Sequence, residues 1–284
     1  GSVTQSKATY TSIKTALESV SAPYHGKSYS IFLQGSYGND TNIYADSDVD
    51  VAMMLTDVYY DDINSLSEED KAAYLAAKTV GKYSYPEFRS DVITRLSQQY
   101  GRSVKPGKKA IFIEGDSNRR DCDVLACVEL RKYTEFKSFS SQTYHAGICF
   151  WTTDGVQIVN FPKQHLANCT TKHQNTNRRF KPLVRIIKNM RNSMASKGYI
   201  KEGIAPSYFL EGMLYNVPNY NFSSSYQQSL SDCIDWLYNC THSELVCANG
   251  HYYLCHPSSP VTWRAENLRA FLDAAVRFWH DSHI

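Results

Sequence analysis

Apolar residues recur in short continuous runs through the first half of the chain. The runs are residues 30–34, 49–55, 110–113 and 122–130. Short apolar runs bounded by turn residues are typical of buried strands. The segments near residues 67–79 and 86–100 have a helical texture, and residues 3–22 carry apolar positions at helical spacing. Strands mixed with helices predict an α/β (α+β) fold with a mixed sheet, which opens with an amphipathic helix.

From about Arg178 the apolar positions change to a helical period. They follow one another every three or four residues over residues 180–194 and 209–217, and again from Trp263 to His280. Such spacing places one apolar stripe on each helix. We therefore predict a mixed α/β part over residues 3–177 and a helical part over residues 178–284.

A Gly-Ser pair and two aspartates lie between the first two predicted strands or at their ends. Gly35 and Ser36 come directly after one strand, and Asp48 and Asp50 lie at the head of the next. A strand that ends in Gly-Ser and opens a helix brings backbone N–H groups close to a polyphosphate. Residues two apart on a strand share a face, and carboxylates beside phosphates are typical of a magnesium site. Either motif alone is common in solvated loops, but their coupling favours metal-assisted phosphoryl transfer.

A third carboxylate is needed where two metal ions act together. Asp121 and Asp123 share a face by alternation where the run at residues 122–130 begins, and Asp123 directly precedes its apolar residues. We therefore predict Asp123 as the metal ligand and Asp121 as a supporting or solvated residue. The alternative for Asp123 is an ordinary aspartate at a strand edge.

Composition narrows the class of protein. The chain has 284 residues, 42% of them hydrophobic, and 30 Lys and Arg against 28 Asp and Glu give a net charge of +2. This balance argues against a protein that mainly grips long nucleic acid, so any basic site must be local. No apolar run is long enough to span a bilayer, and no signal-peptide pattern opens the chain. We expect a cytoplasmic protein without a membrane partner, whose eight cysteines are reduced thiols.

Together these motifs resemble those of the polymerase-β-like nucleotidyltransferase superfamily. Within it, the string FLQGSYGNDTNIYADSDVDV is similar to the bacterial cGAS/DncV-like nucleotidyltransferases (CD-NTases), and most similar to their CdnE-type branch. The segments FPKQHLANCTTKHQNTNRRFKPLVRIIKNMRNSM and IAPSYFLEGMLYNVP resemble the helical half of the same family. The likeness spans about residues 30–220. It implies a catalytic core over residues 3–177 and a helical domain over residues 178–284 that closes the nucleotide cleft.

The resemblance assigns nucleotide-binding roles to residues of the helical half. Lys188 and Ser207 match the family's triphosphate-binding lysine and serine, and Tyr208 matches an aromatic residue that stacks on the base. Pro206 suits a first helical turn, which would place Ser207 at an anion-binding helix end. The alternatives are a solvated basic face for Lys188, with Lys181 and Arg185, and a core aromatic for Tyr208.

Two departures from the family pattern bear on the prediction. Asp123 is followed by Val-Leu-Ala where a Val-Val-Pro-like segment is common, which leaves the metal ligand intact. Lys172-His173 stands where relatives tend to have Lys-Asn, in a region that approaches the nucleotide. We therefore include His173 among the nucleotide-binding candidates and leave the choice of base open. The alternative is that His173 is a surface loop residue.

Cysteine and histidine are dense near the end of the helical half. Cys233, Cys240 and Cys247 are spaced by sevens, and His242, His251, Cys255 and His256 lie nearby. Such a group can bind zinc, but tight Cys-x2-Cys pairing is missing. The spacing by sevens favours instead one buried face of a helix.

The resemblance implies an enzyme that joins nucleoside triphosphates into a cyclic di- or trinucleotide messenger and releases pyrophosphate. Two Mg²⁺ ions, or Mn²⁺ in their place, would be held by Asp48, Asp50 and Asp123. The implied setting is anti-phage (CBASS) signalling, with room for a regulatory protein partner. The alternatives are a transferase that modifies RNA ends or a small molecule, and a non-catalytic nucleotide-binding protein.

Overall fold

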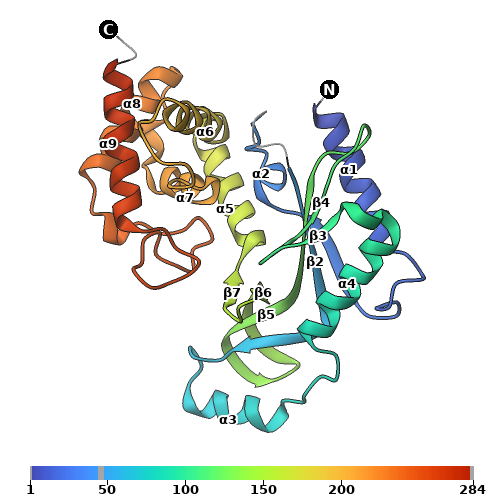
Figure 1. Ribbon diagram of the computed structural model, residues 1–284. Coiled ribbons are helices and arrows are strands. Elements are labelled where there is room, and N and C mark those ends of the chain that lie inside the picture. Colours follow the sequence, from blue (N-terminus) through green and yellow to red (C-terminus); the bar gives the residue numbers. More distant parts are fainter. Residues whose placement is uncertain (1, 44–47, 282–284) are drawn as a thin grey trace. The chain divides into compact units, whose positions relative to one another are not determined.

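The computed structural model of the chain describes residues 2–43 and 48–281, which fall into two compact units. The sheet unit contains the described residues up to Gln34 and from Asp48 to Phe161. The helical unit contains residues 35–43 and the described residues from Pro162 onward (Figure 1). This division differs from the expected boundary at residue 177. The helix before that boundary groups with the helical unit, and so do residues 35–43, which we call the Gly-Ser segment.

The sheet unit is built from one mixed sheet and the helices around it. Its strands are β1 (Tyr29–Leu33), β2 (Val49–Asp62), β3 (Val104–Pro106), β4 (Ile111–Ile113), β5 (Cys122–Ser138), β6 (Ser141–Trp151) and β7 (Gln157–Asn160). Its helices are α1 (Ser2–Leu17), α3 (Glu68–Ala77) and α4 (Tyr85–Tyr100). Helix α4 begins with a capping box between Ser84 and Glu87, which satisfies backbone donors of its first turn.

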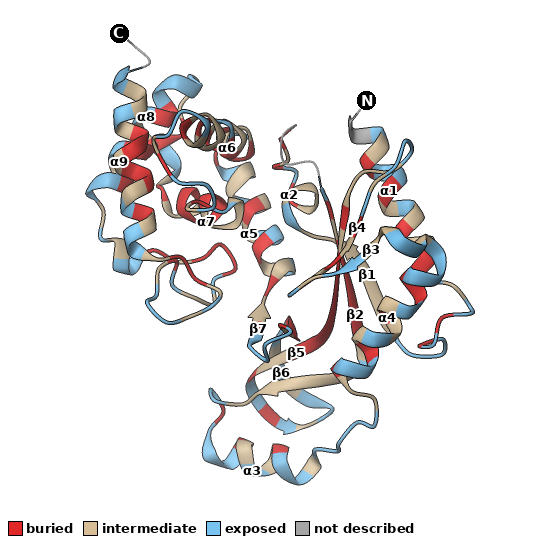
Figure 2. Cartoon of the chain, in the orientation of Figure 1, coloured by how far each residue is buried: buried red, intermediate tan, exposed pale blue. Residues whose placement is uncertain are grey.

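The strands run in the order β1-β2-β5-β4-β3, and β6 and β7 extend the sheet from β5. β2 and β5 pair in parallel, and the other pairs are antiparallel. The near-continuous apolar runs of these two strands are buried, as Figure 2 shows. Strands covered on both faces need such runs. The edge strand β1 is only half-buried, in contrast to the buried strand expected there.

The sequence pattern did not predict strands β3, β6 and β7 or the second halves of β2 and β5. β2 and β5 continue to Asp62 and Ser138, past the apolar runs that mark their first halves. β5 pairs with β6, and β6 pairs with β7, although the first half of β6 is mostly exposed and carries no apolar run. This outer part carries a small aromatic cluster under α3, formed by Tyr74, Tyr133 and Phe136.

The helical unit surrounds one large apolar core. Its helices are α2 (Gly35–Gly38), α5 (Pro162–Asn175), α6 (Phe180–Ser196), α7 (Ser207–Asn216), α8 (Tyr226–Asn239) and α9 (Ala265–Asp281). α6 and α9 present strongly one-sided apolar stripes to this core, as their spacing predicts. None of the helices described is both long and apolar enough to cross a membrane.

The cysteines spaced by sevens do not share a helix face, and that interpretation was wrong. Cys233 lies on α8, Cys240 caps the end of that helix, and Cys247 lies in the following loop. Cys233 and Cys247 are nevertheless buried in the same apolar core. Each of the chain's eight cysteines is a free thiol.

Candidate functional site

Two of the predicted metal ligands are direct neighbours across the central strand pair. Asp50 on β2 is in register with Asp123 on β5. Because the strands are parallel, residues in register lie side by side with their side chains on one face. Asp48 precedes β2 by one residue and is exposed, while Asp50 and Asp123 are half-buried. The sheet unit therefore gathers three carboxylates at the beginning of its two central strands.

The carboxylates repel one another in this arrangement. Burial raises the pKa of Asp123, and the charges of Asp48 and Asp121 raise it further. Burial also raises the pKa of the neighbouring Cys122 thiol, with added repulsion from Asp50 and Asp123. Like charges held together are costly unless a cation neutralises them. The cluster is thus preorganised for a positive ligand.

Asp121 supports the site through hydrogen bonds. Of the two predicted alternatives, a supporting or a solvated residue, the structure favours the first. The Oδ1 of Asp121 accepts a hydrogen bond from the Gly115 N–H at 2.7 Å, and its backbone oxygen accepts one from Val49. A Cβ at Gly115 would lie 2.6 Å from the Arg119 carbonyl oxygen, so this position requires glycine. These contacts join the loop before β5 to the start of β2, where the carboxylates lie.

The donor set of the cluster fits magnesium. Asp48, Asp50 and Asp123 offer only carboxylate oxygens, which are the ligands that Mg²⁺ prefers. Burial and the charges of Asp48 and Asp121 raise the pKa of Asp123, and a divalent cation would favour its ionised form. Half-exposed carboxylates also leave room for substrate oxygens to complete the coordination. The residues present therefore fit the predicted metal.

The Gly-Ser segment opens with a short helical turn. Gly35 has a φ of 62°, a left-handed conformation that glycine adopts readily. The N–H groups of Asn39 and Thr41 bond back to the carbonyls of Gly35 and Ser36. Asp40 has a φ of 54°, which is uncommon for a residue with a side chain. The segment therefore contains two left-handed residues and needs outside contacts to hold it.

Two basic side chains of α6 contact this segment. Arg185 donates from Nη1 to the Asp40 carbonyl at 2.7 Å, and Lys188 donates from Nζ to the Thr41 carbonyl at 3.0 Å. Lys188 is completely buried, and Lys181 is 8% exposed. The alternative of a solvated basic face is therefore wrong for these two lysines. A contact between Lys188 and a triphosphate stays a prediction.

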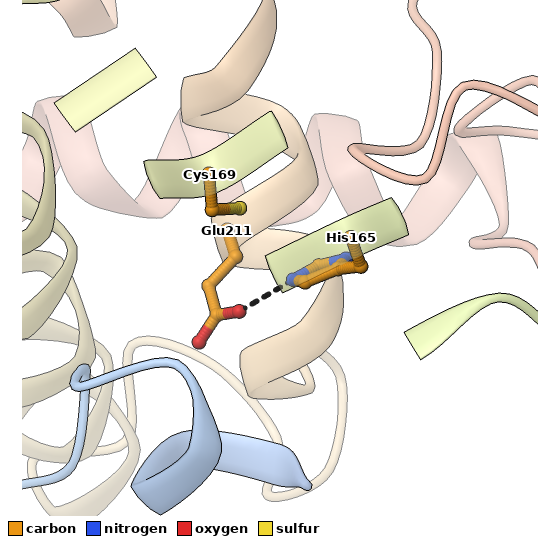
Figure 3. A group of neighbouring side chains, drawn as sticks. All are labelled: His165, Cys169 and Glu211. Atoms are coloured by element: carbon orange, nitrogen blue, oxygen red, sulfur yellow. Dashed lines mark hydrogen bonds and ion pairs between the residues drawn. The ribbon is translucent and has the colours of Figure 1, made fainter. Parts of the chain in front are cut away.

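Sequence reasoning missed Glu211, which lies at the centre of a buried polar network. Its Oε2 accepts hydrogen bonds from Asn39 Nδ2 at 2.8 Å and from His165 Nε2 at 2.7 Å, and its Oε1 accepts one from the Thr41 hydroxyl. Lys188 Nζ lies 3.7 Å from Oε1. Figure 3 shows the carboxylate of Glu211 reaching the His165 ring. The available signal was a lone carboxylate within the apolar helix α7.

The network has an ionised carboxylate at its centre. Burial alone would raise the pKa of Glu211, but the bond and charge of His165, the charge of Lys188 and the bond from Thr41 together lower it. Buried charges persist only where such partners satisfy them.

Ser207 and Tyr208 lie at the start of α7, where the sequence predicts them. Helix N-termini attract anions, so the position of Ser207 suits a phosphate. The Tyr208 ring stacks on His165 with centroids 4.8 Å apart, and its hydroxyl accepts from Asn249 Nδ2 at 3.0 Å. Burial raises the pKa of that hydroxyl. Tyr208 packs against the core of the helical unit, as its alternative interpretation expected, and its stacking on a base stays a prediction.

His173 belongs to the last turn of α5 and not to a surface loop. Its Nδ1 accepts a hydrogen bond from the Lys181 N–H at 3.3 Å, next to the first turn of α6. Burial and the nearby charge of Lys181 lower its pKa. The His173 ring is half-buried, and its lowered pKa favours the uncharged form at neutral pH.

One group among the described residues has the spacing of metal ligands, and it lies outside the predicted cysteine and histidine cluster. It consists of His165, Cys169 and Glu211, whose ligand atoms lie within 4.8 Å of one another (Figure 3). Both Glu211 oxygens already accept hydrogen bonds, and the Lys188 ammonium lies beside them. The group therefore functions as a charged hydrogen-bond network and is poorly suited to a cation.

Comparison with known proteins connects these features to a family. Residues 167–280 match the cGAS/DncV-like nucleotidyltransferase C-terminal helical domain. A cyclic UMP-AMP synthase of Rhodothermus marinus is 36% identical over 281 residues, which is 98% of this chain and 93% of that protein. This chain belongs to the cGAS/DncV-like nucleotidyltransferase family. It is therefore a nucleotidyltransferase of the cyclic nucleotide synthase type, as its motifs predicted.

Further relatives place the chain near the CdnE synthases. A cyclic dipurine nucleotide synthase of Elizabethkingia meningoseptica is 38% identical over 214 residues, which is 75% of this chain and 72% of that protein. The solved Rhodothermus marinus CdnE c-UMP-AMP synthase, with Apcpp and Upnpp, superposes with a TM-score of 0.87 at 34% identity. The match covers 98% of this chain and 92% of that one. The predicted fold class and the CdnE-type resemblance are thereby confirmed.

Proposed function

We propose that this enzyme joins two nucleoside triphosphates into a cyclic dinucleotide through two successive transfers, each releasing pyrophosphate. The observation that carries the proposal is the registered pair of Asp50 and Asp123, with Asp48 beside it, in a chain that matches cyclic nucleotide synthases along most of its length. We further propose that the product is a signal in anti-phage (CBASS) defence and that the enzyme acts in the cytoplasm.

Each transfer forms one bond and breaks one. A ribose hydroxyl oxygen attacks the α-phosphorus of the neighbouring nucleotide, the bond from that phosphorus to pyrophosphate breaks, and the hydroxyl loses its proton. Mg²⁺ bound by the three carboxylates would activate the hydroxyl and neutralise the departing charge. Asp123 is poised to orient the attacking hydroxyl, and Asp48 and Asp50 supply the charge that holds the metal.

The helical unit supplies the groups that suit the triphosphate. The Gly-Ser turn lets the backbone approach phosphate oxygens, and the start of α7 at Ser207 favours an anion. Lys188 adds a positive charge that bonds the Thr41 carbonyl of the same segment. Tyr208 offers an aromatic face on which any base can stack. These assignments follow the family resemblance.

The decisive experiment is product analysis. The enzyme is incubated with ATP, GTP, CTP, UTP and Mg²⁺, and the mixture is treated with phosphatase and resolved by mass. A phosphatase-resistant cyclic dinucleotide is the expected result, since a ring has no terminal phosphate. A cyclic trinucleotide would correct the ring size, whereas linear products alone or no turnover would contradict the proposal. The relatives are named for different bases, so the masses also identify the bases joined.

Base choice is expected to depend on His173. If the ring reaches a base edge, one hydrogen bond there favours one base by about 1–3 kcal/mol, roughly ten- to a hundredfold in rate. His173→Ala should then change the ratio of bases in the product when the four triphosphates are equimolar, with smaller effects on total turnover. The exposed His25→Ala serves as the matched control. Equal ratios for wild type and His173→Ala would exclude His173 from base selection.

A further inference from the structure

The Gly-Ser segment is continuous in sequence with strand β1 but is packed into the helical unit. Its contacts explain this. Asn39 and Thr41 send their side chains to Glu211, while the carbonyls of Asp40 and Thr41 accept from Arg185 and Lys188. Three consecutive residues of the segment are therefore bonded to helices α6 and α7.

Glu211 is the common acceptor of this arrangement. Its side chain is 3% exposed, and Asn39 and Thr41 are 9% and 0% exposed. A buried carboxylate that accepts several hydrogen bonds is costly to disturb, because each donor left without it loses its partner. His165 on α5 does not bond the segment itself. It bonds the Glu211 carboxylate and so helps to orient it.

The segment needs this support because it is conformationally unusual. Gly35 and Asp40 both have left-handed backbones, and at Asp40 this conformation is sterically strained because the residue has a Cβ. Such a conformation persists only where the surroundings hold it. Glu211 bonds the side chains of Asn39 and Thr41, on either side of Asp40, and Lys188 bonds the Thr41 carbonyl. The N–H groups of Asn39 and Thr41 in turn bond the carbonyls of Gly35 and Ser36.

We propose that Glu211 is a positioning residue, which fixes the conformation of the nucleotide-binding turn by bonding Asn39 and Thr41, the residues that follow the turn in the chain. The inference rests on the proposed function of that turn. It goes beyond that function in assigning the buried carboxylate of Glu211 on α7, which bonds Asn39, Thr41 and His165, to the preorganisation of phosphate binding. A turn that is already ordered binds phosphate without a further loss of entropy.

The sharpest test changes the segment side of the contact. Thr41→Val removes the hydroxyl at nearly constant volume, and Thr41→Ser keeps it. Thr41→Val is expected to raise the KM for nucleoside triphosphate about tenfold with kcat within about threefold of wild type, because the turn must be ordered on binding. Thr41→Ser should retain a near-normal KM. Glu211→Gln should resemble Thr41→Val, and the exposed Glu266→Gln on α9 is the control.

Hydrogen exchange without nucleotide gives a second measurement that does not depend on activity. The amides of Asn39 and Thr41 are expected to exchange about tenfold faster or more in Thr41→Val and Glu211→Gln than in wild type or Glu266→Gln. If the wild type makes no cyclic product but this difference appears, the proposed function fails and the positioning role stands. Wild-type KM and wild-type exchange in both Thr41→Val and Glu211→Gln would overturn the positioning role itself.

Discussion

Replacing Asp48 and Asp50 together by asparagine is expected to reduce nucleotide joining by at least about 10³-fold, because the site loses the charge that binds the metal. The substitution conserves side-chain size, and Asp48 is exposed while Asp50 is half-buried, so packing should be unaffected. Product formation is measured alongside a thermal melting curve. Substantial activity in a folded double variant would contradict the assignment of these aspartates.

The same substitution should change the response of the fold to magnesium. Burial of Asp123 and the nearby charges of Asp48 and Asp121 raise its pKa, so keeping this carboxylate ionised opposes folding when no cation is bound. Wild-type protein should therefore melt at a higher temperature in Mg²⁺ than in EDTA, since a ligand that binds only the folded state stabilises it. The double variant should lose most of that difference. Asp62→Asn, at the far end of β2, provides a matched control.

The second large effect is expected at Lys188, and it concerns stability. Lys188→Met leaves the buried carboxylate of Glu211 without its nearby ammonium, and breaking a buried charge pair on one side costs about 3–5 kcal/mol. Urea unfolding of Lys188→Met, Glu211→Gln and the double variant measures the effect. The double variant should be less destabilised than the sum of the single variants, since it removes both charges.

The result also decides how Lys188 acts. Simple addition of the two single effects would mean that the two side chains do not depend on each other. A raised KM for nucleotide in Lys188→Met with unchanged stability would instead favour the direct triphosphate contact that the family resemblance implies. Lys181→Met on the same helix is the matched control for a buried lysine.

Local patterns were sufficient to predict much of the sheet unit. The apolar runs that lead away from Asp50 and Asp123 mark the first halves of β2 and β5, because strands covered on both faces need continuous apolar sequence. The capped start of α4 has a similarly local origin. The outer strand β6 opens with Ser, Gln, Thr, Tyr and His, a mostly polar stretch without an apolar run, and only pairing with β5 makes it a strand. Pairing between distant segments leaves little trace in either segment alone.

The candidate site shows the same limit. The three aspartates could be found from the sequence because each borders an apolar run. Glu211 could not be assigned a role in this way, since its partners Asn39 and Thr41 come from a distant part of the chain. For the same reason Lys188 looked like part of a solvated face, although the Gly-Ser segment covers it. Burial of a polar residue depends on what packs over it, and helical periodicity does not report that.

The parallel pairing of β2 with β5 has a consequence for how the protein matures. Helices α3 and α4 and strands β3 and β4 lie between the two strands in the chain, so Asp50 and Asp123 meet only after that whole crossover has been closed. Closing a long loop is slow compared with forming a helix. During refolding, helical structure should therefore appear before magnesium affinity does. On the ribosome, a nascent chain that has not yet released β5 is expected to lack the proposed metal site and therefore the activity that depends on it.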